Sequence, residues 1–209
     1  DEVIFETHAH PGGAYMWLSR AKREGIVVKT FVPDPTSSAG NLERIEALIT
    51  PRTKVIEVSH ITAPTGILMP VKEIAELAND RGIWFHVDGA QSAGQIPIDL
   101  HDIGCQSYAT SGHKWMGAPH GTGMLYVRRD KIPGVWPLTA AAARQSDDIR
   151  KFEEIGTHPA APTLAVAEAL TFHEGIGAER KAERLRYLTR YWVERVQDLP
   201  GVTLYTSLD

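Results

Sequence analysis

Short apolar runs alternate with segments of helical periodicity along the first part of the chain. Residues 83–87 are apolar almost throughout, which is typical of a strand covered on both faces. Other short runs that predict strands occupy residues 26–32, 55–58, 106–110 and 122–127. The opening residues 1–5 indicate the approach to a further buried strand.

Two segments between these runs have the spacing of helices. Asn41 is a suitable cap for a helix with apolar positions at Leu42, Ile45, Leu48 and Ile49. A second helix is predicted to have Pro70 in its first turn and Gly82 at its end. One face of that helix is formed by Val71, Ile74, Leu77 and Ala78. This strand–helix alternation predicts an α/β fold whose sheet is mostly parallel in its first part.

After Arg128 the pattern changes. Pro133, Gly134 and Pro137 indicate a loop, and residues 140–143 indicate a mobile or ligand-facing stretch. Helices are predicted over residues 162–173 and 178–199. The longer helix has an apolar stripe of Leu185, Leu188, Trp192, Val196 and Leu199. Its many arginines and glutamates are interpreted as its solvated face. Gly201 ends this helix, and a final strand is predicted to begin at Val202.

Composition narrows the possible classes of protein. The chain has 209 residues, 43% of them hydrophobic, and a formal net charge of −4, which argues against a nucleic-acid partner. No apolar stretch approaches the roughly 20 residues of a membrane span, so no membrane partner is expected. The single cysteine, Cys105, excludes an intrachain disulfide. The chain starts without Met, so we expect the middle of a longer polypeptide. We expect it to be cytoplasmic, with export by a lost leader as the open alternative.

Asp88 and Lys114 are the residues with the most suggestive chemistry. Asp88 stands at the carboxyl end of an apolar strand, where ligands bind in open α/β sheets. A carboxylate at that place can hold a protonated pyridine nitrogen, and a lysine amine can form an imine. Pyridoxal phosphate (PLP) requires both groups. Taken alone, Asp88 also suits a turn or a helix cap, and Lys114 suits a surface charge.

Residues next to Asp88 and Lys114 in the sequence add hydrogen-bond donors. Gln91 follows Asp88 closely, and Ser111 and His113 lead into Lys114 with hydroxyl and imidazole groups that suit a phosphate. Gly117, Gly121 and Gly123 indicate a backbone shaped around something. The histidines have no metal-ligand spacing, and no nucleotide-binding glycine pattern occurs, so we expect no metal site.

The sequence resembles the class V aminotransferase group of PLP-dependent enzymes of fold type I. The matching stretches are residues 88–91, 111–115, 121–127 and 152–157. The resemblance implies a mostly parallel sheet sandwiched by helices, a PLP-binding large domain over residues 1–172, and the start of a smaller α+β domain over residues 173–209. It also implies that Lys114 is the Schiff-base lysine, that Asp88 holds the pyridine nitrogen, that Gln91 donates to the ring oxygen, and that Ser111 and His113 bind the phosphate.

Two further residues matter if the resemblance holds. His10 falls where the family places the ring that stacks on the cofactor, although a turn residue is the alternative. Thr157 resembles the residue that reaches the cofactor phosphate of the neighbouring subunit, which implies a homodimer with a shared active site. Its alternative is a helix-capping hydroxyl.

The sequence also departs from the family pattern. Desulfurases and lyases of the group usually carry an asparagine where this chain has Ala63, and the surrounding residues look more like the isopenicillin N epimerase branch. A phosphate loop, a carboxylate-binding arginine and a desulfurase cysteine are expected outside these residues. Cys105 is interpreted as a buried core thiol.

The resemblance implies an enzyme that acts on the α-carbon of an amino acid or of a peptide bearing one. Lys114 would remove the α-proton, and His10 would be the second acid–base group that epimerisation needs. An epimerase or aminotransferase is the first expectation. A C–S or C–Se lyase and a non-catalytic domain of the same fold are the alternatives.

Overall fold

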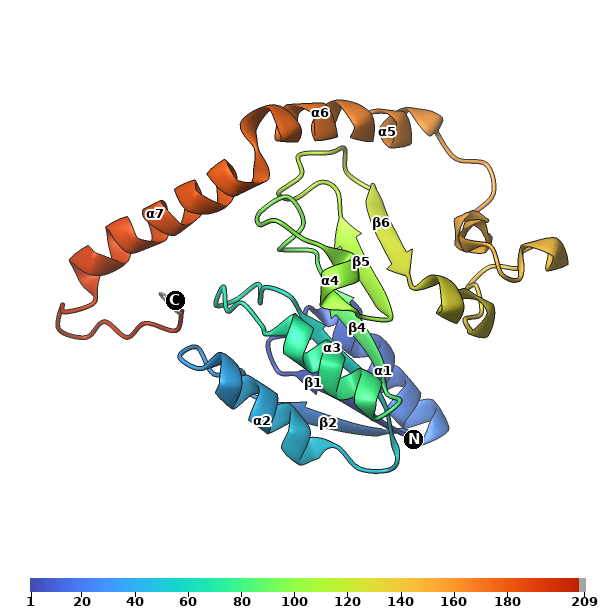
Figure 1. Ribbon diagram of the computed structural model, residues 1–209, viewed down its shortest axis with the longest axis horizontal. Helices are drawn as coiled ribbons and strands as arrows, with labels where there is room; N and C mark the ends of the chain where they lie inside the picture. Colours follow the sequence, from blue (N-terminus) through green and yellow to red (C-terminus); the bar gives the residue numbers. More distant parts are fainter. Residues whose placement is uncertain (207–209) are drawn as a thin grey trace.

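A single six-stranded sheet organises the chain (Figure 1). The computed structural model describes residues 1–206. The strand order is β2-β1-β3-β4-β5-β6, and only β6 runs antiparallel to its neighbour. The strands are β1 (Glu2–Glu6), β2 (Val27–Phe31), β3 (Thr53–Ser59), β4 (Trp84–Asp88), β5 (Ser107–Ser111) and β6 (Gly123–Val127). The prediction of a mostly parallel sheet is confirmed.

Helices cover both faces of this sheet. Helix α1 (Pro11–Glu24) packs on one face, where Trp17 lies against the buried pair Val3 and Phe5. Helices α2 (Ser38–Leu48), α3 (Val71–Asp80) and the short α4 (Leu100–Ile103) lie on the other face, over the larger core. Side chains alternate between the faces along each strand, so β3 contributes Val55 to the α1 layer and Ile56 and Val58 to the larger core.

The helix predicted from Asn41 begins earlier in the structure. Ser37 is the cap, with its hydroxyl accepting from the Gly40 amide at 2.9 Å. Asn41 is buried inside α2, and its amide bonds both backbone groups of Asp34. A short polar side chain can bond nearby backbone in either setting, so the prediction of Asn41 as a cap was wrong. The α3 prediction is confirmed, with Pro70 directly before the helix and Gly82 just past it.

The chain after β6 contains three short 3₁₀ turns, η1 (Arg129–Gly134), η2 (Ala143–Gln145) and η3 (Ile149–Glu153), and then three helices. The helices are α5 (Ala160–Leu164), α6 (Val166–Ile176) and α7 (Ala178–Val196). Helices α5 and α6 lie beside the β5–β6 end of the sheet, and α7 leads away from it (Figure 1). Buried Lys151 ties this stretch together by donating to the carbonyls of Ile132 and Ser146. Residue 173 falls within α6, and the division into two domains there stays a prediction.

Two predictions for the last part of the chain were wrong. The buried residues of α7 are Ala182 and Val193, whereas Leu188, Trp192 and Leu199 are 42%, 46% and 53% exposed. The buried stripe is therefore rotated from the predicted one, because what α7 packs against decides its inner face. Residues 202–206 form no strand. An extended segment becomes a strand only with a partner for its backbone groups, and none pairs with these described residues.

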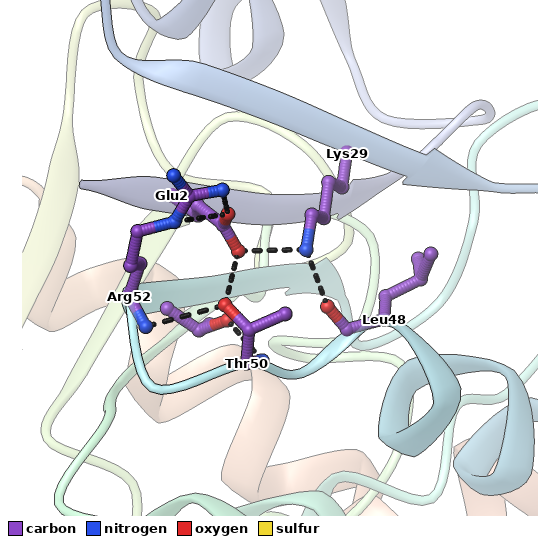
Figure 2. A network of polar contacts seen from close by, with 6 residues as sticks. Glu2, Lys29, Leu48, Thr50 and Arg52 are labelled. Atoms are coloured by element: carbon purple, nitrogen blue, oxygen red, sulfur yellow. Dashed lines mark hydrogen bonds and ion pairs between the residues drawn. The ribbon is translucent and has the colours of Figure 1, made fainter.

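A buried carboxylate anchors the amino end of the sheet (Figure 2). Glu2 on β1 is fully buried and forms ion pairs with Lys29 and Arg52, each at 2.6 Å. The Thr50 hydroxyl donates to the same carboxylate at 2.6 Å. Bonds from Lys29, Thr50 and Arg52 hold the pKa of Glu2 down, to about 2. We refer to these four residues as the Glu2 cluster.

No helix among the described residues combines the length and the apolar character needed to cross a membrane.

Candidate active site

Asp88 lies at the carboxyl end of β4, in a turn held by backbone bonds. Its carboxylate accepts from the Ala90 amide at 2.9 Å, and its carbonyl accepts from the His60 amide at 2.8 Å. The next amide, of Gly89, donates to the Ala109 carbonyl on β5 at 2.7 Å. These bonds to two neighbouring strands fix the direction in which the Asp88 side chain leaves the sheet.

The buried side chain of Tyr108 supports the turn at Asp88. The Tyr108 ring packs directly against Gly89, where any side chain would overlap it. Its hydroxyl bonds the His60 ring at 3.0 Å and the Ser92 hydroxyl at 2.5 Å. Burial lowers the pKa of His60 to about 4 and raises the pKa of Tyr108, so both groups are neutral at physiological pH. The turn therefore rests on a rigid, uncharged support.

Lys114 lies in the turn that follows β5. Ser111 ends the strand, and the Gly112 amide donates to the Thr122 carbonyl at 2.8 Å, which draws the turn against the start of β6. A side chain at Gly112 would lie 2.5 Å from the Thr122 hydroxyl, so only glycine allows this approach. The rings of His113 and His120 stack with 5.1 Å between their centroids.

His10 caps α1. Its backbone is extended, and its Nδ1 atom accepts from the Gly12 amide at 3.1 Å. An accepting Nδ1 places the ring proton on Nε2. His10 thus serves as a turn residue, as one interpretation held, and also lines the pocket described next.

One pocket of about 450 Å³ lies between the start of α1 and the carboxyl ends of β3, β4 and β5. It brings together five of the predicted site residues, namely His10, Asp88, Ser111, His113 and Lys114. Their side chains come from three separate parts of the sequence. Proximity of Asp88 and Lys114 follows from the pairing of β4 with β5.

Two predicted site residues do not line this pocket. The Gln91 carbonyl oxygen accepts from the Trp115 indole at 3.0 Å, which directs that end of the side chain to the turn after Lys114. Thr157 lies exposed in the loop before α5. Ala63, in the turn between β3 and α3, is exposed and also outside the lining. The roles predicted for Gln91 and Thr157 stay predictions.

Two titratable residues that line the pocket, Glu57 and His86, were not among the predicted site residues. Glu57 on β3 and His86 on β4 are paired neighbours in the sheet, and both side chains line the pocket. Burial raises the pKa of Glu57 to about 7 and lowers the pKa of His86. The His86 ring bonds the Ser107 hydroxyl at 2.8 Å. A charged or imidazole side chain inside an otherwise apolar strand is the signal that identifies both residues.

The donor set of this pocket fits PLP. It offers one lysine amine, one carboxylate beyond the end of β4, and hydroxyl and imidazole donors at Ser111 and His113. A volume of about 450 Å³ falls in the range typical of small-molecule sites. Lys114 would hold the aldehyde carbon, Asp88 the ring nitrogen, and Ser111 with His113 the phosphate.

The aminotransferase class-V family matches residues 1–209, and the chain belongs to this family of PLP-dependent enzymes. The isopenicillin N epimerase of Amycolatopsis lactamdurans is 33% identical, over 96% of this chain and 55% of its own length. A probable cysteine desulfurase of Halalkalibacterium halodurans is 30% identical, over 98% and 52%. The chain thus spans about half the length of these curated relatives.

Solved structures have the same fold. The cysteine desulfurase CsdA of Escherichia coli superposes with a TM-score of 0.83 at 23% identity, over 96% of this chain and 52% of that one. The cystine C–S lyase C-DES, in complex with its product cysteine persulfide, superposes with a TM-score of 0.81 at 26% identity, over 96% and 57%. A mutant of C-DES with glycine covalently linked to the PLP cofactor has a TM-score of 0.81 at 25% identity, over 96% and 56%. The predicted fold type I architecture is confirmed.

Proposed function

We propose that this protein is a PLP-dependent enzyme acting at the α-carbon of an amino acid or of a peptide bearing one. The observation that carries the proposal is that Lys114 and Asp88 line one pocket, together with the hydroxyl and imidazole donors Ser111 and His113. Bound PLP supplies an electron-withdrawing ring that stabilises negative charge at the α-carbon of the attached amino acid.

The chain's own residues supply anchoring and proton transfer. Lys114 would hold the cofactor, and its amine would be the base for the α-proton of the substrate. Asp88 would hold the protonated ring nitrogen, and its backbone bonds keep that carboxylate at a fixed position. Ser111 and His113 would donate to the phosphate. His10, at the start of α1, would lie beside the ring and supply Nε2–H as the second acid.

We favour epimerisation or transamination as the reaction, and the position of His10 is the reason. His10 lines the pocket from α1, whereas Lys114 lies after β5, so acid–base groups reach the pocket from two elements. Epimerisation requires such a pair, because a proton leaves one face of the α-carbon and returns at the other. We further propose a homodimer in which Thr157 approaches the phosphate of the neighbouring subunit.

A C–S lyase is the second candidate, favoured by the likeness to C-DES and to cysteine desulfurases. Cys105 does not serve such a reaction as a sulfur acceptor. It is fully buried, lies outside the pocket, and burial raises the pKa of its thiol to about 11. Elimination of a sulfur group from the substrate needs no protein thiol and remains compatible with the pocket.

Reduction of the covalent adduct tests the site. Full-length protein incubated with PLP and then with borohydride is expected to carry a pyridoxyl group on the peptide containing Lys114, as measured by mass spectrometry. Lys114→Ala should abolish the adduct, whereas Lys54→Ala, which removes an exposed lysine on β3, should leave it unchanged. Equal labelling of the Lys114→Ala protein would refute the assignment.

The reaction branch is tested by three product assays on the loaded protein. Loss of optical activity with deuterium incorporation from D₂O indicates epimerisation, keto acid formation indicates transamination, and sulfide release from cysteine or cystine indicates a lyase. A labelled protein that gives none of these products with any amino acid would favour the non-catalytic alternative.

A further inference from the structure

Glu57 is the buried carboxyl group of the pocket, whereas Asp88 is partly exposed, and Glu57 has no cationic partner among the described residues. It is 3% exposed on β3 and lies in register with His86 on β4, two residues before Asp88. One carboxyl oxygen accepts from the Trp17 indole of α1. The other faces Gly13, where an added side chain would lie 2.5 Å away. No ion pair to Glu57 occurs within residues 1–206.

The groups around Glu57 favour its neutral form. Glu6, at the end of β1, and Asp88, on β4, are both carboxyls, and each raises its pKa. His86 on β4 is held neutral by burial. His10 from the start of α1, and His113 and Lys114 from the turn after β5, line the same pocket and form no hydrogen bond with the Glu57 carboxyl within residues 1–206. The Trp17 indole donates to Glu57, which opposes this effect, and burial outweighs it.

We propose that Glu57 holds a proton in the cofactor-free pocket and releases it to solvent when PLP binds, so that this side chain couples cofactor affinity to pH. The inference rests on the proposed function. A protonated pyridine nitrogen placed at Asp88 brings a positive charge into the pocket that Glu57 lines. That charge favours the ionised carboxyl, and by linkage an ionised Glu57 favours the bound ring.

Ionisation of Glu57 also strengthens its contact with helix α1. The bond from the Trp17 indole becomes charge-assisted when Glu57 loses its proton, and such bonds are about twice as strong as neutral ones. Trp17 lies two turns into α1, the helix that His10 caps, so a stronger bond to Glu57 holds the helix that carries His10 more firmly against the pocket. Glu57 is therefore a positioning residue for α1 as well as a charged wall of the pocket.

The first test needs no cofactor. Emission of Trp17 should change as its acceptor ionises, so the cofactor-free full-length protein is titrated from about pH 5 to pH 9. The chain has five tryptophans, and subtracting the spectrum of Trp17→Phe isolates this one. We expect a transition near neutral pH that Glu57→Gln abolishes and that Glu76→Gln, an exposed control on α3, retains. A transition unchanged in Glu57→Gln would overturn the assignment of the proton to Glu57.

The second test measures PLP affinity by absorbance between about pH 6 and pH 8.5. Release of one proton on binding raises affinity by up to about tenfold per pH unit below the pKa of the group. We expect a slope that is steeper in the wild-type protein than in Glu57→Gln, and equal slopes would overturn the coupling. Glu57→Met, also neutral, serves if the glutamine variant is poorly folded. If no protein binds PLP at any pH, the proposed function and the coupling fail together, while the emission titration still decides where the proton lies.

Discussion

Glu2 and Glu57 are both buried glutamates on adjacent strands of one sheet, yet their surroundings are opposite. Glu2, at the amino end of β1, forms ion pairs with Lys29 and Arg52, and these partners with Thr50 lower its pKa to about 2. Glu57, near the carboxyl end of β3, has one hydrogen bond from an indole and no cation, and its pKa rises to about 7. A buried glutamate is therefore a stable anion at the amino end of the sheet, whereas at the carboxyl end it is a group that gains and loses a proton near neutral pH.

The contrast reflects what each end of the sheet does. At the amino end, the buried carboxylate of Glu2 is paired with two cations of the same chain, Lys29 and Arg52 (Figure 2). At the carboxyl end, the ionisable groups Glu57, Asp88 and Lys114 line one pocket and form no ion pair within residues 1–206. Ligands bind beyond the carboxyl ends of strands in open α/β sheets, and unmatched charge at this edge is what a charged ligand would complete.

The largest effect is expected from Lys114→Ala. Loss of the amine that anchors the cofactor and moves the α-proton should lower activity by about a thousandfold or more, because the two tasks share one group. Unfolding temperature should not fall, since no hydrogen bond of the Lys114 side chain is lost among the described residues. Product formation is measured on the protein incubated with PLP, and thermal unfolding on the cofactor-free protein, because loss of a bound ligand by itself lowers the unfolding temperature. A large loss of stability would mean that Lys114, like the residues of the Glu2 cluster, stabilises the fold.

Glu57→Gln should stabilise the cofactor-free protein at alkaline pH. A raised pKa means that Glu57 contributes its full stability below about pH 4.5 and that this contribution is lost as pH rises to about 7. Glutamine mimics the protonated acid, so the variant should exceed the wild type by about 3 kcal/mol at pH 8. The two should be equal near pH 4. Denaturant unfolding at both pH values measures the difference, and a variant less stable at pH 8 would contradict the neutral state of Glu57.

Glu2→Gln should have the reverse pH dependence. A lowered pKa means that the contribution of Glu2 is present above about pH 4.5 and lost as pH falls towards about 2. The variant leaves Lys29 and Arg52 with a neutral partner, so it should unfold several degrees below the wild type at pH 7. The gap should narrow in acid. Thermal unfolding between pH 3 and pH 7 measures this difference in stability. Glu73→Gln, which changes an exposed glutamate on α3, provides the matched control.

His10→Phe should have the smallest effect on the protein and a selective effect on the reaction. The ring can still stack, so PLP affinity is expected to be retained, while proton exchange at one face of the α-carbon should slow. Loss of the cap on α1 should cost about 1 kcal/mol. Deuterium incorporation into each enantiomer of a substrate measures the exchange. Full exchange at both faces in the variant would refute the acid–base role of His10.

The sequence contained enough information for the sheet and for much of the pocket. The apolar run before Asp88 identified β4, and the parallel pairing of β4 with β5 then brought the residues after both strands to one edge. Local signals of this kind are sufficient where one strand is buried on both faces. Lys114 and His113 were noticed from their order and their neighbours in the sequence, and the family resemblance then assigned each a specific role.

Other features depended on tertiary contacts that no local pattern encodes. Ser37 and Asn41 both suit a helix cap, and only the fold of the preceding loop around Asp34 decided between them. The inner face of α7 depends on what lies beneath it. Glu57 was passed over within a strand, because its importance comes from Asp88 and Trp17, which are distant in sequence.

The contact between Gly89 and the Tyr108 ring restricts the order in which this chain can change. Any residue larger than glycine at position 89 overlaps that ring, so a substitution there is tolerated only after Tyr108 has become smaller. A smaller residue at position 108 removes the hydroxyl shared by His60 and Ser92, and so weakens the support of the Asp88 turn before any gain at position 89. Each single substitution is therefore expected to destabilise the protein. Substitutions at positions 89 and 108 should then occur together in related sequences or not at all.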